Sequence, residues 1–383
     1  MKSETLALLL AGSLLACSSH YEVGRMDPQA AGATASSASG SNGVFPIGSG
    51  GIAGSASGGN TQLAATAGGE PGTACTTATA PMPLSGPFQA PAEVWKRIAT
   101  LLFAQPVTPP SALPSETTYD WAGQIVQQLF DQASAKADAA PGADDFVQAW
   151  LELDSSAEPF SQAWGQLLAA DKPALDVLLE TPQSDARRVG VFSEQAWLKQ
   201  YPLISTRGYL ISQAALGMVV PPEPGSVKDR PDSPPAAGYS RRQQLEASVA
   251  YPSCAACHNL IDPLGLSLEH FDGQGVYRTL DAAQPVDSSS MYVLQLSGRT
   301  ISFDDVADLG SQLADTCDAS GGFASHYLAL GLTRLGVSPD SLTAVHDANV
   351  ARVQQAFVAG GRSYRALVTA FAQSSAVLER PAE

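Results

Sequence analysis

Residues 254–278 read CAACHNLIDPLGLSLEHFDGQGVYR. The stretch opens with two cysteines three positions apart, Cys254 and Cys257, and His258 follows directly. This spacing fits three kinds of site: a covalently attached porphyrin with a histidine ligand, a redox disulfide, or one half of a zinc site. The rest of the sequence bears on the choice among them.

The haem interpretation explains all three residues. Two thiols in this spacing reach the two vinyl groups on one edge of the porphyrin, and the adjacent histidine binds iron from one face. A zinc site would need two further ligands, and Cys317 and His326 form no recognisable second pair. A thioredoxin-like site would need a βαβ setting, which is absent here. The motif therefore predicts one haem c held by Cys254 and Cys257, with His258 as the proximal ligand.

The residues after the motif are interpreted as the floor of the haem pocket. Asp262-Pro263 predicts a turn directly after the motif, and Gly265 allows close backbone approach to the ring edge. Arg278 is expected either to pair with a haem propionate, because a guanidinium matches a carboxylate, or to be solvated. Two further carboxylates are expected to brace the turn rather than to catalyse: Glu269 and Asp272.

The sequence identifies the sixth iron ligand less clearly than it identifies His258. Met291 lies 33 positions after His258 and is the first candidate, with Met218 and His270 as others. Methionine ligation raises the reduction potential and suits electron transfer. An open sixth position would instead indicate peroxide or small-ligand chemistry.

The beginning of the chain resembles a bacterial export signal. Lys2 is followed by a short apolar segment, and residues 14–17 read LLAC. Residues 1–17 are therefore predicted to be a lipoprotein signal peptide with Cys17 as the lipid-modified residue, and Ser18 favours the outer membrane. We expect membrane contact through this anchor alone, with the body facing the periplasm or the cell surface.

Residues 18–84 are rich in Gly, Ser, Ala and Thr and lack a periodic apolar pattern. Such a segment buries too little surface to offset its ordering entropy, so a flexible tether is predicted. With the other three cysteines assigned, Cys75 and Cys317 are left as a pair. A disulfide between them is expected in an oxidising compartment.

The remaining chain is predicted to be mostly α-helical, with a helical bundle-like body, the haem-binding segment and a small irregular β piece at 291–303. Apolar residues recur at helical spacing from residue 90 onward. We expect a helical support domain at 85–200 and a cytochrome c-like haem-binding domain at 201–383, with a proline-rich surface loop at 219–238. Helices are expected at 205–218, 239–250, 304–316, 323–336, 340–359 and 362–378.

The formal net charge is −16, and no run of Lys or Arg stands out. Nucleic acid is excluded as an expected partner, because phosphate contacts need clustered positive charge. An acidic surface would suit a basic redox partner protein, although it also serves solubility.

Several elements of the opening stretch resemble the cytochrome c-like domains first noted in planctomycetes and common in myxobacteria, which are of unknown function. Their pattern runs Cys-x-x-Cys-His, Asp-Pro-Leu-Gly, Leu-Glu, Phe-Asp and Gly-x-Tyr-Arg, and each element occurs here in that order. Residues 188–191 (RVGV) and 205–208 (STRG) are similar to the family as well. The resemblance extends over roughly residues 90 to 380, with a diverged N-terminal part.

These observations together predict a mono-haem cytochrome c-like lipoprotein that transfers single electrons at the outer membrane or in the periplasm. Two alternatives stay open. One is a haem peroxidase or oxidoreductase with an open sixth position, and the other is a non-redox surface-binding or assembly module.

Overall fold

The computed structural model of the chain describes residues 87–103, 108–134, 141–218, 238–249, 252–336 and 343–379. This part is mostly helical and carries two small antiparallel sheets, which confirms the predicted fold class. The predicted signal peptide, Cys17, the tether with Cys75, and residues 219–237 of the proline-rich loop lie outside the described residues.

The helices follow one another along the chain, and the connection between α10 and α11 carries the strands. Their bounds are α2 (Pro91–Leu102), α3 (Tyr119–Ser134), α4 (Ala143–Trp150), α5 (Glu158–Leu168), α6 (Ala174–Glu180), α7 (Gln195–Gln200), α8 (Ile204–Leu216), α9 (Arg241–Val249), α10 (Pro252–Leu266), α11 (Val306–Ala314), α12 (Cys317–Arg334), α13 (Thr343–Ala359), α14 (Tyr364–Ala372) and α15 (Ser375–Leu378), with short 3₁₀ turns at Ser155–Ala157 and Val191–Ser193.

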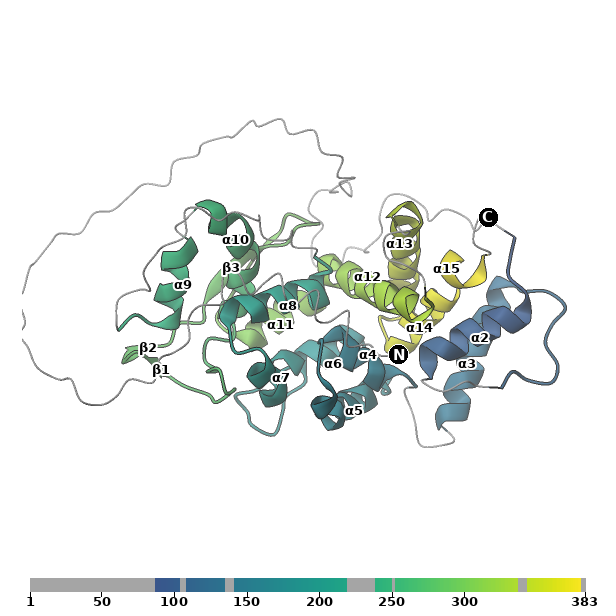
Figure 1. Ribbon diagram of the computed structural model, residues 1–383, viewed down its shortest axis with the longest axis horizontal. Coiled ribbons are helices and arrows are strands. Elements are labelled where there is room, and N and C mark those ends of the chain that lie inside the picture. Colours follow the sequence, from purple (N-terminus) through teal and green to yellow (C-terminus); the bar gives the residue numbers. More distant parts are fainter. Residues whose placement is uncertain are drawn as a thin grey trace, which may run out of the picture.

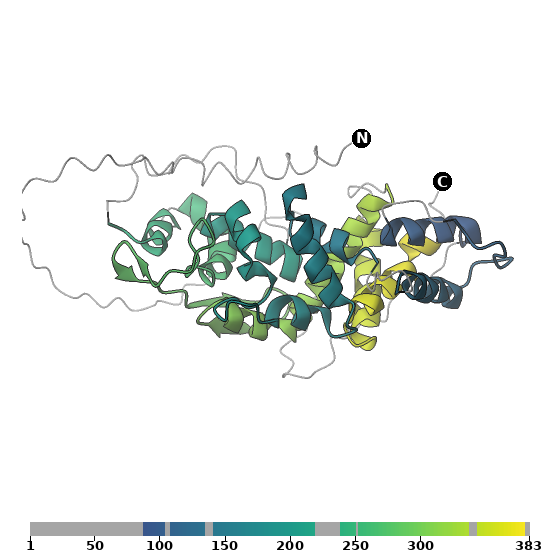
Figure 2. The ribbon, with the colours of Figure 1, turned by 90° about the horizontal axis from the view of Figure 1, so that it is seen from below.

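The molecule is elongated, and its two ends differ in content (Figures 1 and 2). Helices α2 and α3 lie at one end beside α14 and α15, so the first and last described helices pack together. Helices α9 and α10 lie at the other end with the strands. We call these regions the closing end (α2, α3, α14, α15) and the motif end (α7–α10 and residues 267–303).

Aromatic side chains fill the core around α4. The Phe146 ring has its centroid 5.4 Å from that of Phe323, 5.1 Å from Tyr327 and 5.9 Å from Tyr364. All four are buried, and edge-to-face or tilted pairs at these distances are favourable beyond the area they bury. We call Phe146, Phe323, Tyr327 and Tyr364 the aromatic cluster. It joins α4, α12 and α14, so helices from before and after residue 200 share one core.

The predicted β piece is a hairpin. Strand β3 (Ser290–Val293) pairs antiparallel with β4 (Thr300–Phe303), with Met291 opposite Ser302. Alternate residues are buried, Tyr292 on one strand and Ile301 on the other, as expected for strands covered on one face. A second small pair, β1 (Leu280–Asp281) with β2 (Gln284–Pro285), was not expected from the sequence.

Helix α12 begins six residues before the expected start at 323. The reason is a cap: the Thr316 side chain accepts a hydrogen bond from the Ala319 amide at 3.0 Å. The single helix expected over 362–378 is two, α14 and α15, separated at Ser374.

No helix in the described ranges is both long and apolar enough to cross a lipid bilayer.

Candidate haem-attachment site

The Cys-x-x-Cys-His motif lies on helix α10. Cys254 and His258 are four positions apart and therefore share one face of the helix, and both are buried. Cys257 lies beside them and is half-exposed. Helix α10 packs against α8, α9 and strand β3, so the motif lies within the motif end rather than on a projecting loop.

His258 is held by a carboxylate on the next turn. Its Nδ1 lies 2.8 Å from Oδ2 of Asp262, and the hydroxyl oxygen of Ser205 on α8 lies 3.4 Å from the same nitrogen. His258 is 8% exposed and Asp262 is 4% exposed. A carboxylate accepts only, so Nδ1 carries the proton and Nε2 carries the lone pair that binds a metal.

Helix α10 continues through Asp262-Pro263 to Leu266, so the turn predicted there was wrong. A proline inside a helix removes the bond to the carbonyl four residues earlier, which is that of Asn259. Asn259 itself is an exposed residue. The helix geometry is what places Asp262 one turn from His258.

Helices α8 and α10 cross in close backbone contact. A Cβ atom on Gly208 would lie 1.9 Å from the Ile261 carbonyl oxygen, and one on Gly265 would lie 2.1 Å from the Ile204 carbonyl oxygen. The close approach expected at Gly265 is therefore made to α8. This crossing brings Ser205 beside His258.

Arg207, also on α8, is fully buried and connects the α8–α10 crossing to the loop that follows α10. Its guanidinium donates to four carbonyl oxygens: Phe271 at 2.7 Å, Asp272 at 2.7 Å, Tyr201 at 2.7 Å and Leu198 at 3.1 Å. Burial lowers the pKa of Arg207 to about 9. The side chain fixes residues 271–272 against α7 and α8.

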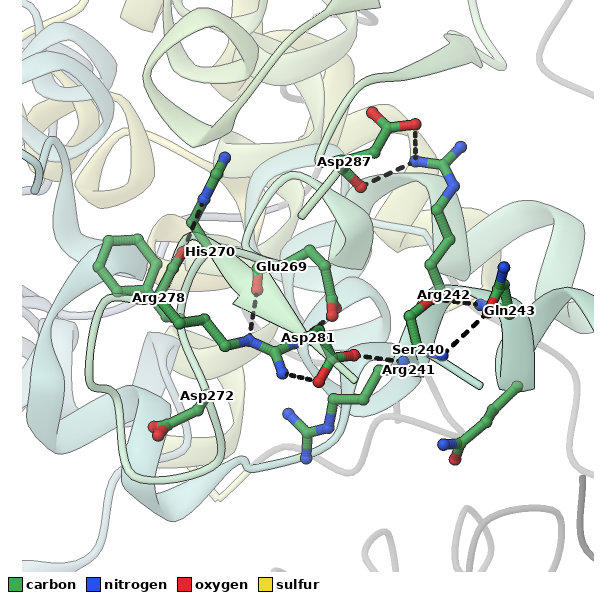
Figure 3. Close-up of polar contacts among 12 residues, drawn as sticks. Ser240, Arg241, Arg242, Gln243, Glu269, His270, Asp272, Arg278, Asp281 and Asp287 are labelled. Carbon is green, nitrogen blue, oxygen red and sulfur yellow. Dashed lines mark hydrogen bonds and ion pairs between the residues drawn. The ribbon is translucent and has the colours of Figure 1, made fainter. Parts of the chain in front are cut away.

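Arg278 points between two protein carboxylates (Figure 3). It forms ion pairs with Glu269 and Asp281, and its Nε donates to the Glu269 carbonyl oxygen at 3.2 Å. The other oxygen of Asp281 accepts from the Arg241 amide at 2.5 Å, at the start of α9. The propionate contact predicted for Arg278 stays a prediction, and the structure gives this guanidinium a bracing role between α9 and the loop.

Glu269 is buried, at 2% exposure, and its second oxygen, Oε2, has no hydrogen-bond partner among the described residues. Burial raises the pKa of Glu269 to about 7, against the opposing effect of Arg278. Asp272 stabilises the turn at residues 272–276, because its Oδ1 accepts from the amides of Gln274 at 2.8 Å and Val276 at 2.9 Å.

Arg188, the first residue of the RVGV stretch, and the preceding Arg187 also contact this loop. Arg188 donates to the Gly275 carbonyl oxygen and lies 4.7 Å over the Phe271 ring. Arg187 lies 4.9 Å over the Tyr277 ring, which also stacks on His270 at 5.1 Å between ring centroids and meets Phe271 edge-to-face at 5.6 Å. His270 Nδ1 faces the Arg278 carbonyl oxygen at 2.9 Å.

Two methionines were named as candidates for the sixth ligand. Met291 lies on β3, the strand that packs beside α10, and its side chain is 68% exposed. The sulfur of Met218 lies 2.8 Å from the Tyr292 hydroxyl, which donates to it. Ligation of iron by Met291 stays a prediction.

The other interpretations of the motif can be compared with the structure. Cys254 and Cys257 are not joined by a disulfide. Cys317 is disulfide-bonded, and this excludes it as a zinc thiolate. His326 Nδ1 faces the Gln213 carbonyl oxygen at 3.3 Å. Because Cys75 lies outside the described residues, its pairing with Cys317 stays a prediction.

The residues present fit a c-type haem. Two thiols and a histidine follow one another on a single helix, and the ring nitrogen that faces away from Asp262 is the one suited to a metal. Asp262 Oδ1 is buried and has no hydrogen-bond partner within the described ranges, so no protein donor reaches this oxygen there. A cationic iron–imidazole unit is the kind of group that such a carboxylate stabilises.

Sequence reasoning missed Asp262, Ser205 and Arg207. The i to i+4 spacing of His258 and Asp262 was a usable signal, but the proline after Asp262 indicated a turn instead. An arginine within an otherwise apolar helix, as at Arg207, was the second signal. Ser205 needed the tertiary crossing, which no local pattern reveals.

Residues 188–281 match the model of a family described as PSCyt3, a protein of unknown function (DUF1588). The match agrees with the resemblance seen in the sequence, but it is narrower than the expected span of roughly 90 to 380. It contains Arg188, the α8–α10 crossing, the Cys-x-x-Cys-His motif and the Arg278 ion pairs. No curated protein and no solved structure matches the chain.

Proposed function

We propose that this chain is a mono-haem c-type cytochrome-like lipoprotein that passes single electrons at the outer membrane or in the periplasm. Haem c supplies an iron that alternates between the ferric and ferrous states. Cys254 and Cys257 would hold it through thioethers, and His258 would bind its iron. A redox partner protein, unidentified, would supply and accept the electron.

The observation that carries this proposal is the His258–Asp262 pair on the motif helix. The 2.8 Å contact occupies Nδ1 and leaves Nε2 as the ligand nitrogen. Metal-binding histidines in proteins are held in this way, whereas a redox disulfide has no need of it. The protein's residues thus bind and orient a metal group without moving a proton.

Attachment at the membrane rests on the beginning of the sequence. A lipid on Cys17, followed by the tether of residues 18–84, would hold the folded body near the membrane surface while leaving it free to meet a partner. Replacing Cys17 with Ala should release the protein from the membrane fraction without changing its absorption spectrum. A variant that stays in the membrane fraction would contradict the lipid anchor.

The function is tested by expression in a periplasm that contains the c-type maturation system, followed by a potentiometric titration monitored by absorbance. We expect a Soret band and a reversible transition that follows a one-electron Nernst curve. Absence of a Soret band would overturn the proposal. The Cys254→Ser/Cys257→Ser variant is the matched control and should lack covalent haem.

The exposed side chain of Met291 favours a second candidate, a haem oxidoreductase with an open sixth position. Ferric protein with a methionine ligand shows a weak sulfur-to-iron band in the far red, and an open site binds cyanide or azide readily. Tight cyanide binding by the wild type, unchanged in Met291→Leu, would favour the enzyme. Cyanide binding that becomes tight only in Met291→Leu would support the electron carrier.

A further inference from the structure

Asp262 has the features of a group that acts on His258 rather than on the fold. It is buried on α10, and among the described residues its side chain makes one polar contact, Oδ2 to His258 Nδ1 at 2.8 Å. Among the described residues, no Lys or Arg forms an ion pair with it, and Oδ1 has no hydrogen-bond partner. A buried carboxylate with so few partners is costly, because burial of charge is unfavourable without compensation.

Both α10 and α8 fix the geometry of the His258–Asp262 pair. The i to i+4 spacing on α10 sets the distance along the helix. The crossing at Gly208 and Gly265 presses α8 against α10, and this places Ser205 3.4 Å from the same nitrogen. Rotation of the imidazole would break the carboxylate contact, so the ring is held in one orientation.

We propose that Asp262 is a positioning residue for the axial histidine: its carboxylate accepts a hydrogen bond from Nδ1–H, makes Nε2 the iron ligand and holds the reduction potential of the haem low. The inference rests on the proposed function. An anionic acceptor at Nδ1 makes the imidazole a stronger donor, and stronger donation stabilises ferric over ferrous iron. The nearby negative charge acts in the same direction.

The matched variants are Asp262→Asn and Asp315→Asn. In Asp262→Asn, the asparagine keeps an acceptor oxygen for Nδ1–H but removes the charge. The Asp315 side chain is 93% exposed, so Asp315→Asn controls for the loss of one negative charge elsewhere on the protein. Ser205→Ala removes the hydroxyl beside Nδ1 and leaves the carboxylate in place.

Haem content is measured first, by the pyridine haemochrome assay, on each protein expressed with the maturation system. Absence of haem from the wild type overturns the proposed function and this inference with it. With haem present, Asp262→Asn should raise the midpoint potential. At a fixed potential the ratio of ferrous to ferric protein should rise at least tenfold, and a tenfold change corresponds to a shift of about 59 mV for one electron. A shift no larger than that of Asp315→Asn would overturn the inference alone.

A second measurement uses the wild type without haem, so it does not depend on whether Asp262→Asn folds or takes up haem. Wild-type protein expressed without the maturation system and labelled with ¹⁵N-histidine should show His258 as the Nδ1–H tautomer, with the resonance assigned by its loss in His258→Gln. Observation of the Nε2–H tautomer for His258 would overturn the role of Asp262, because Nδ1 would then carry no proton to donate.

Discussion

The aromatic cluster and the α8–α10 crossing are both buried, yet they are built by different means. Phe146 contacts three aromatic rings from two other helices, and its place depends on volume and apolar character. At the crossing, two glycines let backbone meet backbone, and Arg207 and Asp262 are buried nearby. The first region is specified by size, whereas the second is specified by residue identity.

The same difference sets how many substitutions each region should accept. A core that depends on volume tolerates exchange among Phe, Leu, Met and Tyr with repacking. A contact that admits no Cβ, or a buried charge that needs one partner, admits few substitutes. The family match covers residues 188–281, which contain the crossing and the Arg278 ion pairs but not the aromatic cluster.

The largest expected effect is on the aromatic cluster. Phe146→Ala should lower the free energy of unfolding by about 3–5 kcal/mol, because it opens a cavity among three rings. Phe146→Leu should cost under about 2 kcal/mol, because most of the volume is kept. Both are measured by chemical denaturation. Equal losses for Ala and Leu would contradict the view that volume is what this region requires.

The next largest effect is at the crossing. Gly208→Ala adds one methyl group where the Ile261 carbonyl oxygen would lie 1.9 Å away, so α8 and α10 must separate. We expect a loss of about 3 kcal/mol in unfolding free energy. If haem is attached as proposed, its absorption spectrum should change as well. A variant as stable as the wild type would contradict the described backbone contact.

A smaller effect is expected on the pH dependence of stability. The pKa of Glu269 is raised from 4.5 to about 7 in the folded protein, so the folded state binds more protons than the unfolded state between these values. Stability should therefore fall as pH rises from about 4.5 to 7, by at most about 1.4 kcal/mol per pH unit from this group.

Glu269→Gln removes that titration and should flatten the curve of unfolding free energy against pH over this range. Asp281→Asn serves as the comparison, since it alters the same ion-pair group and leaves Glu269 in place. A slope in Glu269→Gln equal to that of the wild type would show that Glu269 titrates at its ordinary pKa.

The smallest effect is expected at Gly123 in α3, in the closing end. A Cβ atom there would lie 2.9 Å from Nε2 of Gln373, the far end of a flexible side chain. Gly123→Ala should change the unfolding free energy by no more than about 1 kcal/mol, with helix propensity favouring Ala. Destabilisation as large as that of Gly208→Ala would remove the distinction between the two glycines.

Sequence patterns predicted most of the local structure. The helices expected at 205–218, 239–250, 304–316 and 340–359 match α8, α9, α11 and α13 within a few residues, and alternation around Tyr292 predicted the β piece that forms the β3–β4 hairpin. These features depend on residues close together in the chain. The motif at Cys254 likewise carried the haem prediction by spacing alone.

Features that depend on distant segments were not predicted. Gly265 was assigned to the ring edge, but its neighbour is Ile204 on α8, and only the folded chain brings the two together. Arg278 was expected to meet a propionate or to be solvated, and its ion pairs with Glu269 and Asp281 were not anticipated. Pro263 misled because a proline tolerated inside a helix and a turn proline have the same sequence signature.

The central claim is that the helix-borne motif holds one haem covalently. Intact mass spectrometry of the denatured protein, expressed with the maturation system, tests this most directly. We predict a mass one haem above that of the polypeptide, lost when both Cys254 and Cys257 are replaced with Ala. A polypeptide mass without haem, or haem that survives in the double variant, would contradict the claim.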